Sequence, residues 1–271
     1  MSDPAASRTL RLCSFNIWGG MVFEPLVEFV RQQAPVTDLF CFQETLAAPE
    51  QLSLACGFRT ALFADLAKAL PEFDGVFDPV VSWPEPTPDG REIVVPFGLA
   101  TFARRTLPII ERRPARIIDH FDTLDAVPGL HPIVRWLQLT TLRTSRGTLL
   151  IANYHGIARP GSKLDSDERL EQSRAIRAEL DAHEGPLVLV GDFNLLPDTE
   201  SVRLLGEGRR NLVLEHAIPT TRSRLNPYYG TPQEQPHANY AIVSPEIEVV
   251  QFSVPDVEVS DHLPMLLELR V

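Results

Sequence analysis

Polar side chains able to bind a metal ion or a phosphate group follow apolar, strand-like segments at several places in this sequence. The clearest case is "LVLVGDFNLLPD" (187–198), in which four apolar residues lead directly into Gly191, Asp192, Phe193 and Asn194. Side chains two positions apart on a strand lie on the same face, so Asp192 and Asn194 are expected to point the same way. A carboxylate beside an amide suits a hard divalent cation or a phosphate group.

The same arrangement recurs elsewhere in the chain. Apolar segments end at Asn16, at Glu44 and at His155, and the segment "VSDHLP" adds Asp261 and His262. At any one of these positions a turn-forming role would be the simpler interpretation, because Asp and Asn are common at strand ends. Because the arrangement recurs at several strand ends, we expect these side chains to converge at a single edge of a sheet.

The hydrophobic pattern predicts many strands, frequent hairpins and few helices, which indicates a mixed α/β sandwich rather than a doubly wound parallel sheet. Asp165 is expected to be the N-cap of one helix, with Glu168 completing a variant of the capping box. Strands are predicted at 9–18, 38–45, 97–105, 133–144, 148–156, 187–190, 238–254 and 265–271, and helices at 24–33, 165–183 and 200–208.

Two stretches are less regular. Residues 47–70 are interpreted as a helix, a turn at Gly57 and a strand-like piece, in that order. Residues 71–96 are rich in Pro and Gly and are expected to form a long surface loop or a hairpin near a substrate opening.

Composition limits the classes of function. The formal net charge is −11 and the pI is about 5.1, which argues against a long, nonspecific nucleic-acid groove but allows a phosphate substrate beside a metal ion. The three cysteines, Cys13, Cys41 and Cys56, form no CxxC pair, and the first twelve residues lack the apolar core of a signal peptide. A cytoplasmic protein without a transmembrane segment is therefore expected, and a monomer is assumed.

The segments "SFNIWGG", "CFQET", "NYHG", "GDFNLLPD" and "SDHLP", in this order and spacing, resemble the endonuclease/exonuclease/phosphatase superfamily. The resemblance covers residues 10–270, so residues 1–271 are expected to form one catalytic domain. It implies a four-layered α/β sandwich, with two packed mixed β-sheets flanked by helices. It also implies hydrolysis of a phosphate ester by a phosphodiesterase or a nuclease-like enzyme, through in-line attack of water that depends on Mg²⁺, with Mn²⁺ as an alternative.

The resemblance further implies a role for each motif residue. Glu44 would bind the metal, Asn16 would help to hold the metal and this glutamate, and Asp261 would lie near the metal through water. Asp192 would position or deprotonate the attacking water, and Asn194 would orient Asp192 or bind the phosphate. His155 and His262 would contact phosphate oxygens and stabilise the transition state; either His262 or Asp192 is the general base.

One position departs from the family pattern. Relatives carry an aspartate paired with the SDH histidine, where this chain has Asn239. An amide can orient an imidazole but cannot stabilise its cation. His262 is therefore predicted to have a lower pKa than in relatives with the aspartate, or another acid takes the place of that aspartate. Asn239 and Arg222 are taken as substrate-binding residues, Arg222 through its planar guanidinium. Surface or packing roles are expected for the other histidines, His120, His131, His183, His216 and His237, although His237 lies close to Asn239.

The substrate is left open among DNA, RNA, a lipid and a small phosphate ester. The arginine-rich segment 104–116 is either a contact for an anionic substrate or a solvated strand edge, and the segment 77–83 is a short candidate for a membrane-facing hairpin. A sphingomyelinase or an inositol-phosphate phosphatase is the alternative to a nuclease. A non-catalytic relative that binds a ligand is the alternative to an enzyme, and Asn239 is the feature that favours it.

Overall fold

The structure is a computed structural model that describes residues 9–120, 133–145, 147–158 and 161–271. His131 and the side chain of His120 lie outside the described part of the chain. In that part, two six-stranded sheets have the orders β11-β12-β1-β2-β4-β3 and β5-β6-β7-β8-β10-β9. The first sheet contains β1 (Thr9–Asn16), β2 (Leu39–Leu46), β3 (Phe73–Pro86), β4 (Glu92–Arg104), β11 (Glu248–Ser253) and β12 (Met265–Arg270). The second contains β5 (Ile109–His120), β6 (Ile133–Thr144), β7 (Gly147–His155), β8 (Leu187–Asp192), β9 (Arg210–Asn211) and β10 (Asn239–Val243).

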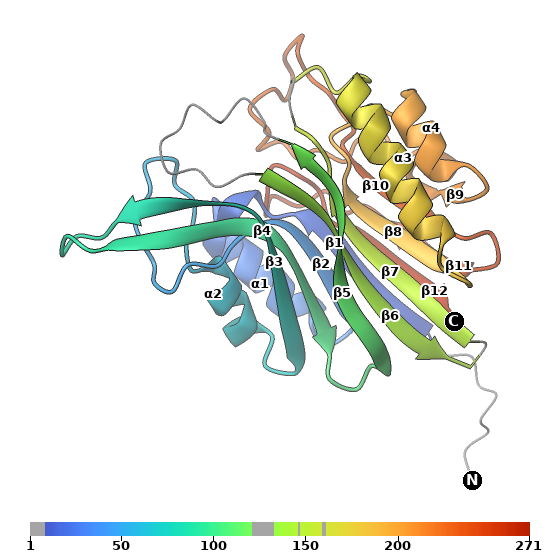
Figure 1. The fold of residues 1–271 in the computed structure, drawn as a ribbon, viewed down its shortest axis with the longest axis horizontal. Coiled ribbons are helices and arrows are strands. Elements are labelled where there is room, and N and C mark those ends of the chain that lie inside the picture. The colour runs from blue at the N-terminus through green and yellow to red at the C-terminus, as the bar shows by residue number, and fades with distance from the viewer. Residues whose placement is uncertain (1–8, 121–132, 146, 159–160) are drawn as a thin grey trace.

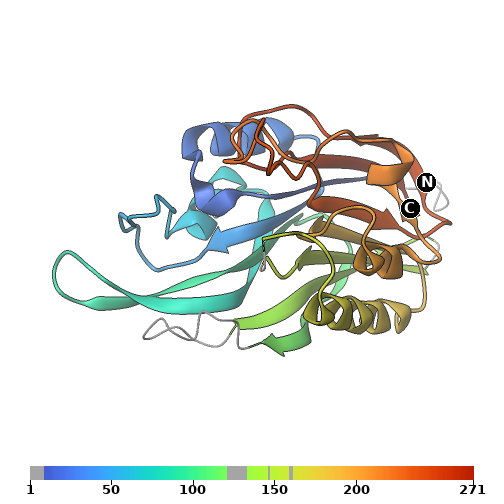
Figure 2. The ribbon, with the colours of Figure 1, turned by 90° about the horizontal axis from the view of Figure 1, so that it is seen from above.

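Helices cover the outer faces of the two packed sheets (Figure 1). Figure 2 shows α1 on one side of the stacked sheets and α3 on the other. The predicted four-layered α/β sandwich is therefore confirmed. The helices are α1 (Phe23–Gln33), α2 (Leu62–Ala69), α3 (Asp167–Asp181), α4 (Glu200–Gly206) and α5 (Leu212–Glu215), and Trp18–Gly20 form a 3₁₀ turn after β1.

Alternation along β1 explains how this strand serves two cores. Leu10 and Leu12 belong to the hydrophobic cluster between the sheets, whereas Cys13 and Phe15 belong to the cluster under α1. Because side chains alternate with a period of two, Asn16 continues the inter-sheet face of Leu12. The last residue of β1 is thereby directed into the space between the two sheets.

Several predictions of local structure were wrong. The N-cap of α3 is Ser166, whose hydroxyl accepts from the Arg169 amide. Asp165 instead accepts from the Glu200 and Ser201 amides at the start of α4. In the region 47–70 the order is reversed: an irregular segment with a turn at Gly57 precedes α2. A cap depends on which helix end the carboxylate reaches, and sequence spacing does not specify that contact.

Residues 73–104 form one long β-hairpin, β3 and β4, whose base belongs to the first sheet and whose tip projects from the body of the molecule (Figure 1). The segment 77–83 lies within β3 and does not form a separate apolar loop. Trp83 packs near Phe97 of β4, with ring centroids 6.4 Å apart. In the described part of the chain, no helix combines the length and the apolar character needed to cross a membrane.

The arginine-rich segment begins at the end of the first sheet that is remote from Glu44. Leu39, at the start of β2, pairs with Ala103, so Arg104 lies beside the first residues of β2. Its guanidinium donates to the Thr37 carbonyl at 3.0 Å and forms an ion pair with Glu72. At Arg104 these contacts favour a structural role over the predicted alternative of a substrate contact.

Candidate active site

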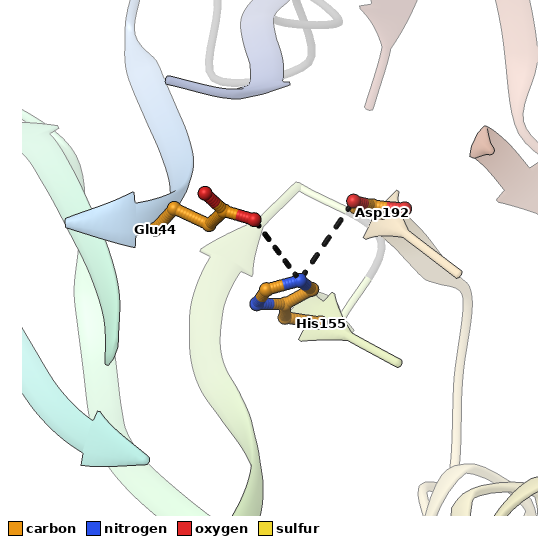
Figure 3. Close-up of side chains that lie close together, drawn as sticks. All are labelled: Glu44, His155 and Asp192. Carbon is orange, nitrogen blue, oxygen red and sulfur yellow. Dashed lines mark ion pairs between the residues drawn. The ribbon is translucent and has the colours of Figure 1, made fainter. Parts of the chain in front are cut away.

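Three residues distant in sequence converge from strands of both sheets, Glu44 from β2 and His155 and Asp192 from the ends of β7 and β8. Ligand atoms of Glu44, His155 and Asp192 all lie within 4.8 Å of one another. His155 Nε2 is 3.7 Å from Glu44 Oε1 and 3.7 Å from Asp192 Oδ2, as Figure 3 shows. This cluster is a compact set of donors for a cation or a phosphoryl group.

Parallel strands bring two of these residues together. In the β7–β8 pair, His155 is directly opposite Asp192, so both side chains stand at the carboxyl ends of neighbouring strands. From the first sheet, Asn16 Nδ2 donates to Glu44 Oε1 at 2.8 Å and to Asp192 Oδ2 at 3.0 Å. Asn16 Oδ1 accepts from the Trp18 amide, which fixes the orientation of the carboxamide. Asn16 therefore links the two carboxylates across the sheets.

A β-bulge directs the Glu44 side chain toward the site. Regular alternation in β2 would place Glu44 on the face of Phe40 and Phe42, against the helices. The β2–β4 register shifts between Phe42 and Thr45, and Glu44 has φ of 58°. A bulge with one residue in the left-handed region redirects a side chain at some conformational cost, a feature common next to active sites.

The prediction that Asp192 and Asn194 share a strand face was wrong. Strand β8 ends at Asp192, and Asn194 lies beyond it with φ of 55°. The Asn194 backbone amide donates to Asp192 Oδ1 at 2.9 Å, while its side-chain amide donates to the Gly156 carbonyl at 3.3 Å. Asn194 thus orients Asp192 through its backbone, and its side-chain oxygen accepts from the ammonium of Lys163.

His262 is held from both sides of its ring. Its Nδ1 lies 2.5 Å from Oδ1 of Asn239, the residue that was predicted to replace the family's aspartate beside this histidine. Because the amide oxygen can only accept, Nδ1 carries the proton and Nε2 carries the lone pair, which Arg222 Nη1 faces as a donor. The buried Thr221 hydroxyl accepts from the backbone N–H of Asn239 at 3.1 Å and so anchors this arrangement.

Asp261 lies outside the tight Glu44–His155–Asp192 cluster. Its Oδ2 accepts from Arg222 Nη1 at 3.2 Å and from Asn226 Nδ2 at 3.0 Å. Its Oδ1 is 3.8 Å from His262 Nε2. The carboxylate is therefore held at the rim of the site by an arginine and an amide.

The protonation states follow from burial and from neighbouring charges. Burial, with repulsion from Asp261, raises the pKa of Glu44 to about 7. Burial lowers the pKa of His155 to about 3 and that of His262 to about 4, where the charge of Arg222 adds to the effect. Burial opposes ionisation of Asp192, but the imidazoles, Arg222 and Lys163 outweigh it and hold the pKa of Asp192 below its usual range. Near neutral pH the site thus has two neutral imidazoles and an ionised Asp192.

A cavity of about 590 Å³ adjoins these residues. Sequence reasoning missed several of its polar groups, among them Lys163 and Asn226, because they belong to no motif. A weak signal existed for Lys163, since the chain has only two lysines, Lys68 and Lys163, among its 25 basic residues. The cavity is lined by Trp18, Gly161, Ser162, Lys163, Arg222, Asn226, Pro227, Tyr228, Gln233, Gln235 and Asp261.

The remaining described histidines make packing or backbone contacts. His237 Nε2 lies 2.9 Å from the Ile218 carbonyl oxygen, and the ring of His216 packs edge-on against Phe252 with centroids 5.3 Å apart. His183 is partly buried, which lowers its pKa. These contacts agree with the surface or packing roles expected for them.

The chain belongs to the endonuclease/exonuclease/phosphatase family, whose sequence profile matches residues 13–262. A comparison with curated proteins gives no significant match.

The chain is similar in fold to several solved members of the same superfamily. The endonuclease/exonuclease/phosphatase from Beutenbergia cavernae has 20% identity and a TM-score of 0.68, with 97% of this chain and 72% of that chain covered. A mannosyl-6-phosphatase from Bacteroides thetaiotaomicron has 17% identity and a TM-score of 0.65, covering 97% and 100% of the two chains. The endonuclease/exonuclease/phosphatase from Bacteroides vulgatus has 16% identity and a TM-score of 0.65, covering 97% and 99%.

Proposed function

We propose that this protein hydrolyses a phosphate ester with the help of a divalent cation, by in-line attack of water. The observation that carries the proposal is the convergence of Glu44, His155 and Asp192 at one end of the inter-sheet space. The family consists of hydrolases acting on phosphoester bonds, which supports the reaction class.

The donor set fits a hard cation. Glu44, Asp192 and Asp261 place carboxylates close enough that their repulsion contributes to the raised pKa of Glu44. Such a cluster of partly or fully buried carboxylates is stabilised by a positive ion, and oxygen donors suit Mg²⁺ or Mn²⁺. We propose Glu44 as the direct ligand, Asn16 as the residue that holds it, and Asp261 as a carboxylate acting through water. When bound, the cation would polarise the phosphoryl group.

The protein side chains would then orient water and bind the phosphoryl oxygens. Asp192 is ionised, and its Oδ1 is fixed by the Asn194 amide, so it can align or deprotonate the attacking water. His262 is a weaker candidate for the base because Arg222 already faces its Nε2. His155 has neither ring nitrogen hydrogen-bonded to any described residue, so its imidazole is available to a phosphate oxygen.

The experiment is hydrolysis of p-nitrophenyl phosphate and bis(p-nitrophenyl) phosphate, with Mg²⁺ and with a chelator. We expect activity only with the metal, and a loss of at least about 100-fold in Glu44→Ala. In parallel, Mg²⁺ should raise the melting temperature of the wild type but not of Glu44→Ala, because a ligand that binds only the native state stabilises it. Activity that survives the chelator, or an equal Mg²⁺ shift in both proteins, would contradict the proposal.

The physiological substrate is best sought with a panel of abasic DNA, single-stranded DNA, sphingomyelin and inositol phosphates. The net charge of −11 favours small phosphate esters over long nucleic acids. A cytoplasmic location is proposed from the sparse cysteines; Cys13 and Cys41 are buried and free, and Cys56 is exposed and free.

A non-catalytic relative that binds a phosphate ligand is the second candidate. Asn239 favours it, because the amide cannot stabilise a protonated His262. Phosphate binding without hydrolysis of any ester in the panel would support this alternative.

A further inference from the structure

Lys163 has an unusual environment for a lysine. It lies on the connection between β7 and α3, half-buried, with φ of 54°. Its ammonium donates to the Ala158 carbonyl at 3.3 Å and to Asn194 Oδ1. Both acceptors are neutral. Since an ammonium carries three N–H donors, one donor is left for another partner.

No carboxylate of the described residues forms an ion pair with Lys163. The other lysine, Lys68, lies 3.1 Å from Asp65 on the surface, and Arg222 lies 3.2 Å from Asp261. Burial of a cation without a paired anion is costly, and it lowers the pKa of Lys163 to about 8. The charge of Asp192 helps the ammonium only from beyond ion-pair distance. An anion supplied by a ligand would complete this environment.

The position of Lys163 indicates which anion that is. Lys163 and Arg222 both line the cavity beside the site, and the ammonium is hydrogen-bonded to Asn194, which holds Asp192. A phosphoryl group placed for attack by water at Asp192 would bring its oxygens near both cations. The left-handed backbone at Lys163 is a strained conformation of the kind retained where a side chain must be held in place.

We infer that Lys163 binds the phosphoryl group of the substrate, as a cationic partner to Arg222. That the bound phosphoryl group belongs to a substrate rests on the proposed function. The binding of phosphate by Lys163 does not depend on hydrolysis. A lysine acts here as a point charge with a free donor, and the neutral acceptors around it keep that charge uncompensated until the phosphate arrives.

The first test uses the unmodified protein and inorganic phosphate as the probe. Trace acetylation with an amine-specific reagent, followed by mass spectrometry of peptides, measures the reactivity of Lys68 and Lys163 in the same sample. We expect phosphate, in the presence of Mg²⁺, to slow acetylation of Lys163 several-fold and to leave Lys68 unchanged. The inference would be overturned if Lys163 reacted equally fast without phosphate and at phosphate concentrations that saturate binding, as followed by calorimetry.

The second test compares Lys163→Met with Lys68→Met, the same change outside the site. Loss of a charged hydrogen bond should weaken phosphate binding by about tenfold or more in Lys163→Met and not in Lys68→Met. For esters that are hydrolysed, the KM of Lys163→Met should rise by a similar factor. Lys163→Arg should bring the KM part of the way back to the wild-type value, which a purely structural role would not produce.

The outcomes separate the two proposals. Phosphate binding that depends on Lys163, without any hydrolysis, would contradict the proposed function and support this inference. Hydrolysis with an unchanged KM in a folded Lys163→Met would overturn this inference and leave the proposed function intact.

Discussion

At the scale of single residues, the contact between His262 and Asn239 governs the protonation of the His262 imidazole. The imidazole donates to an amide rather than to a carboxylate, and burial lowers the pKa of His262 to about 4. Its neutral form therefore persists over the whole range in which an exposed histidine would titrate. The buried Asn239 amide nitrogen has no hydrogen-bond partner among the described residues, so the carboxamide is held mainly through its oxygen.

Asn239→Asp should raise the pKa of His262. A carboxylate next to Nδ1 stabilises the imidazolium, by about one to three pKa units for a close opposite charge. The acidic limb of the pH–rate profile should then move to higher pH, since the imidazolium forms earlier as the pH falls. The pKa is measured from the NMR titration of the imidazole protons, and the limb from kcat/KM.

Asn211→Asp provides the matched control. Asn211 caps α5 outside the site, and Asp caps a helix as well as Asn does. Its pH–rate profile should equal that of the wild type. An unchanged acidic limb and an unchanged pKa in Asn239→Asp would contradict the role assigned to this pair.

At the scale of elements, the β7–β8 pair sets His155 opposite Asp192, the two residues proposed to act on the substrate, and Gly191 allows these strands to approach. Gly191 has φ of 144°, and a Cβ at this position would lie 1.9 Å from the Tyr154 carbonyl oxygen. Tyr154 and Gly191 are partners in the parallel register that sets His155 opposite Asp192. Any side chain here must separate the strands at the base of the site.

Gly191→Ala should reduce the free energy of unfolding by more than about 3 kcal/mol, because both the backbone conformation and the contact are lost. Urea unfolding followed by circular dichroism measures the change. Gly206→Ala at the end of α4 is the control: a Cβ there meets nothing within 4 Å, and the stability should change by less than about 1 kcal/mol. Similar stabilities for the two variants would show that β7 and β8 do not need the glycine.

The same elements show what sequence could and could not predict. Apolar segments that end in polar residues predicted most of the strands and the gathering of Asn16, Glu44, His155, Asp192 and His262. The two packed sheets with helices outside were implied by the resemblance to the family, and β5 was not predicted. The direction of the Glu44 side chain could not be predicted, because it depends on a bulge formed against β4. Lys163 was missed for a related reason: its importance comes from a contact with Asn194, 31 residues away, and from no local pattern.

At the scale of the whole molecule, a layer of buried amides and hydroxyls connects the two sheets beneath the site. Asn153 of β7 accepts from Gln43 Nε2 at 2.7 Å and donates to the Phe42 and Ala100 carbonyls across the interface. Thr101 Oγ1 donates to Gln138 Oε1 at 2.5 Å in the same layer. One apolar cluster also contains residues of both sheets, among them Leu12 and Val190.

Because the two sheets share this core, we expect them to unfold together, as the predicted single domain would. Asn153→Ala should lower the free energy of unfolding by about 3 kcal/mol, because Gln43 and the two carbonyls lose buried partners. Gln32→Ala, an exposed amide on α1, should change it by less than about 0.5 kcal/mol. Calorimetry should give one transition for the wild type and for both variants, with equal calorimetric and van't Hoff enthalpies. Two transitions in Asn153→Ala would mean that the sheets are separate folding units joined by this layer, and the site between them would then be the first part of the molecule to open.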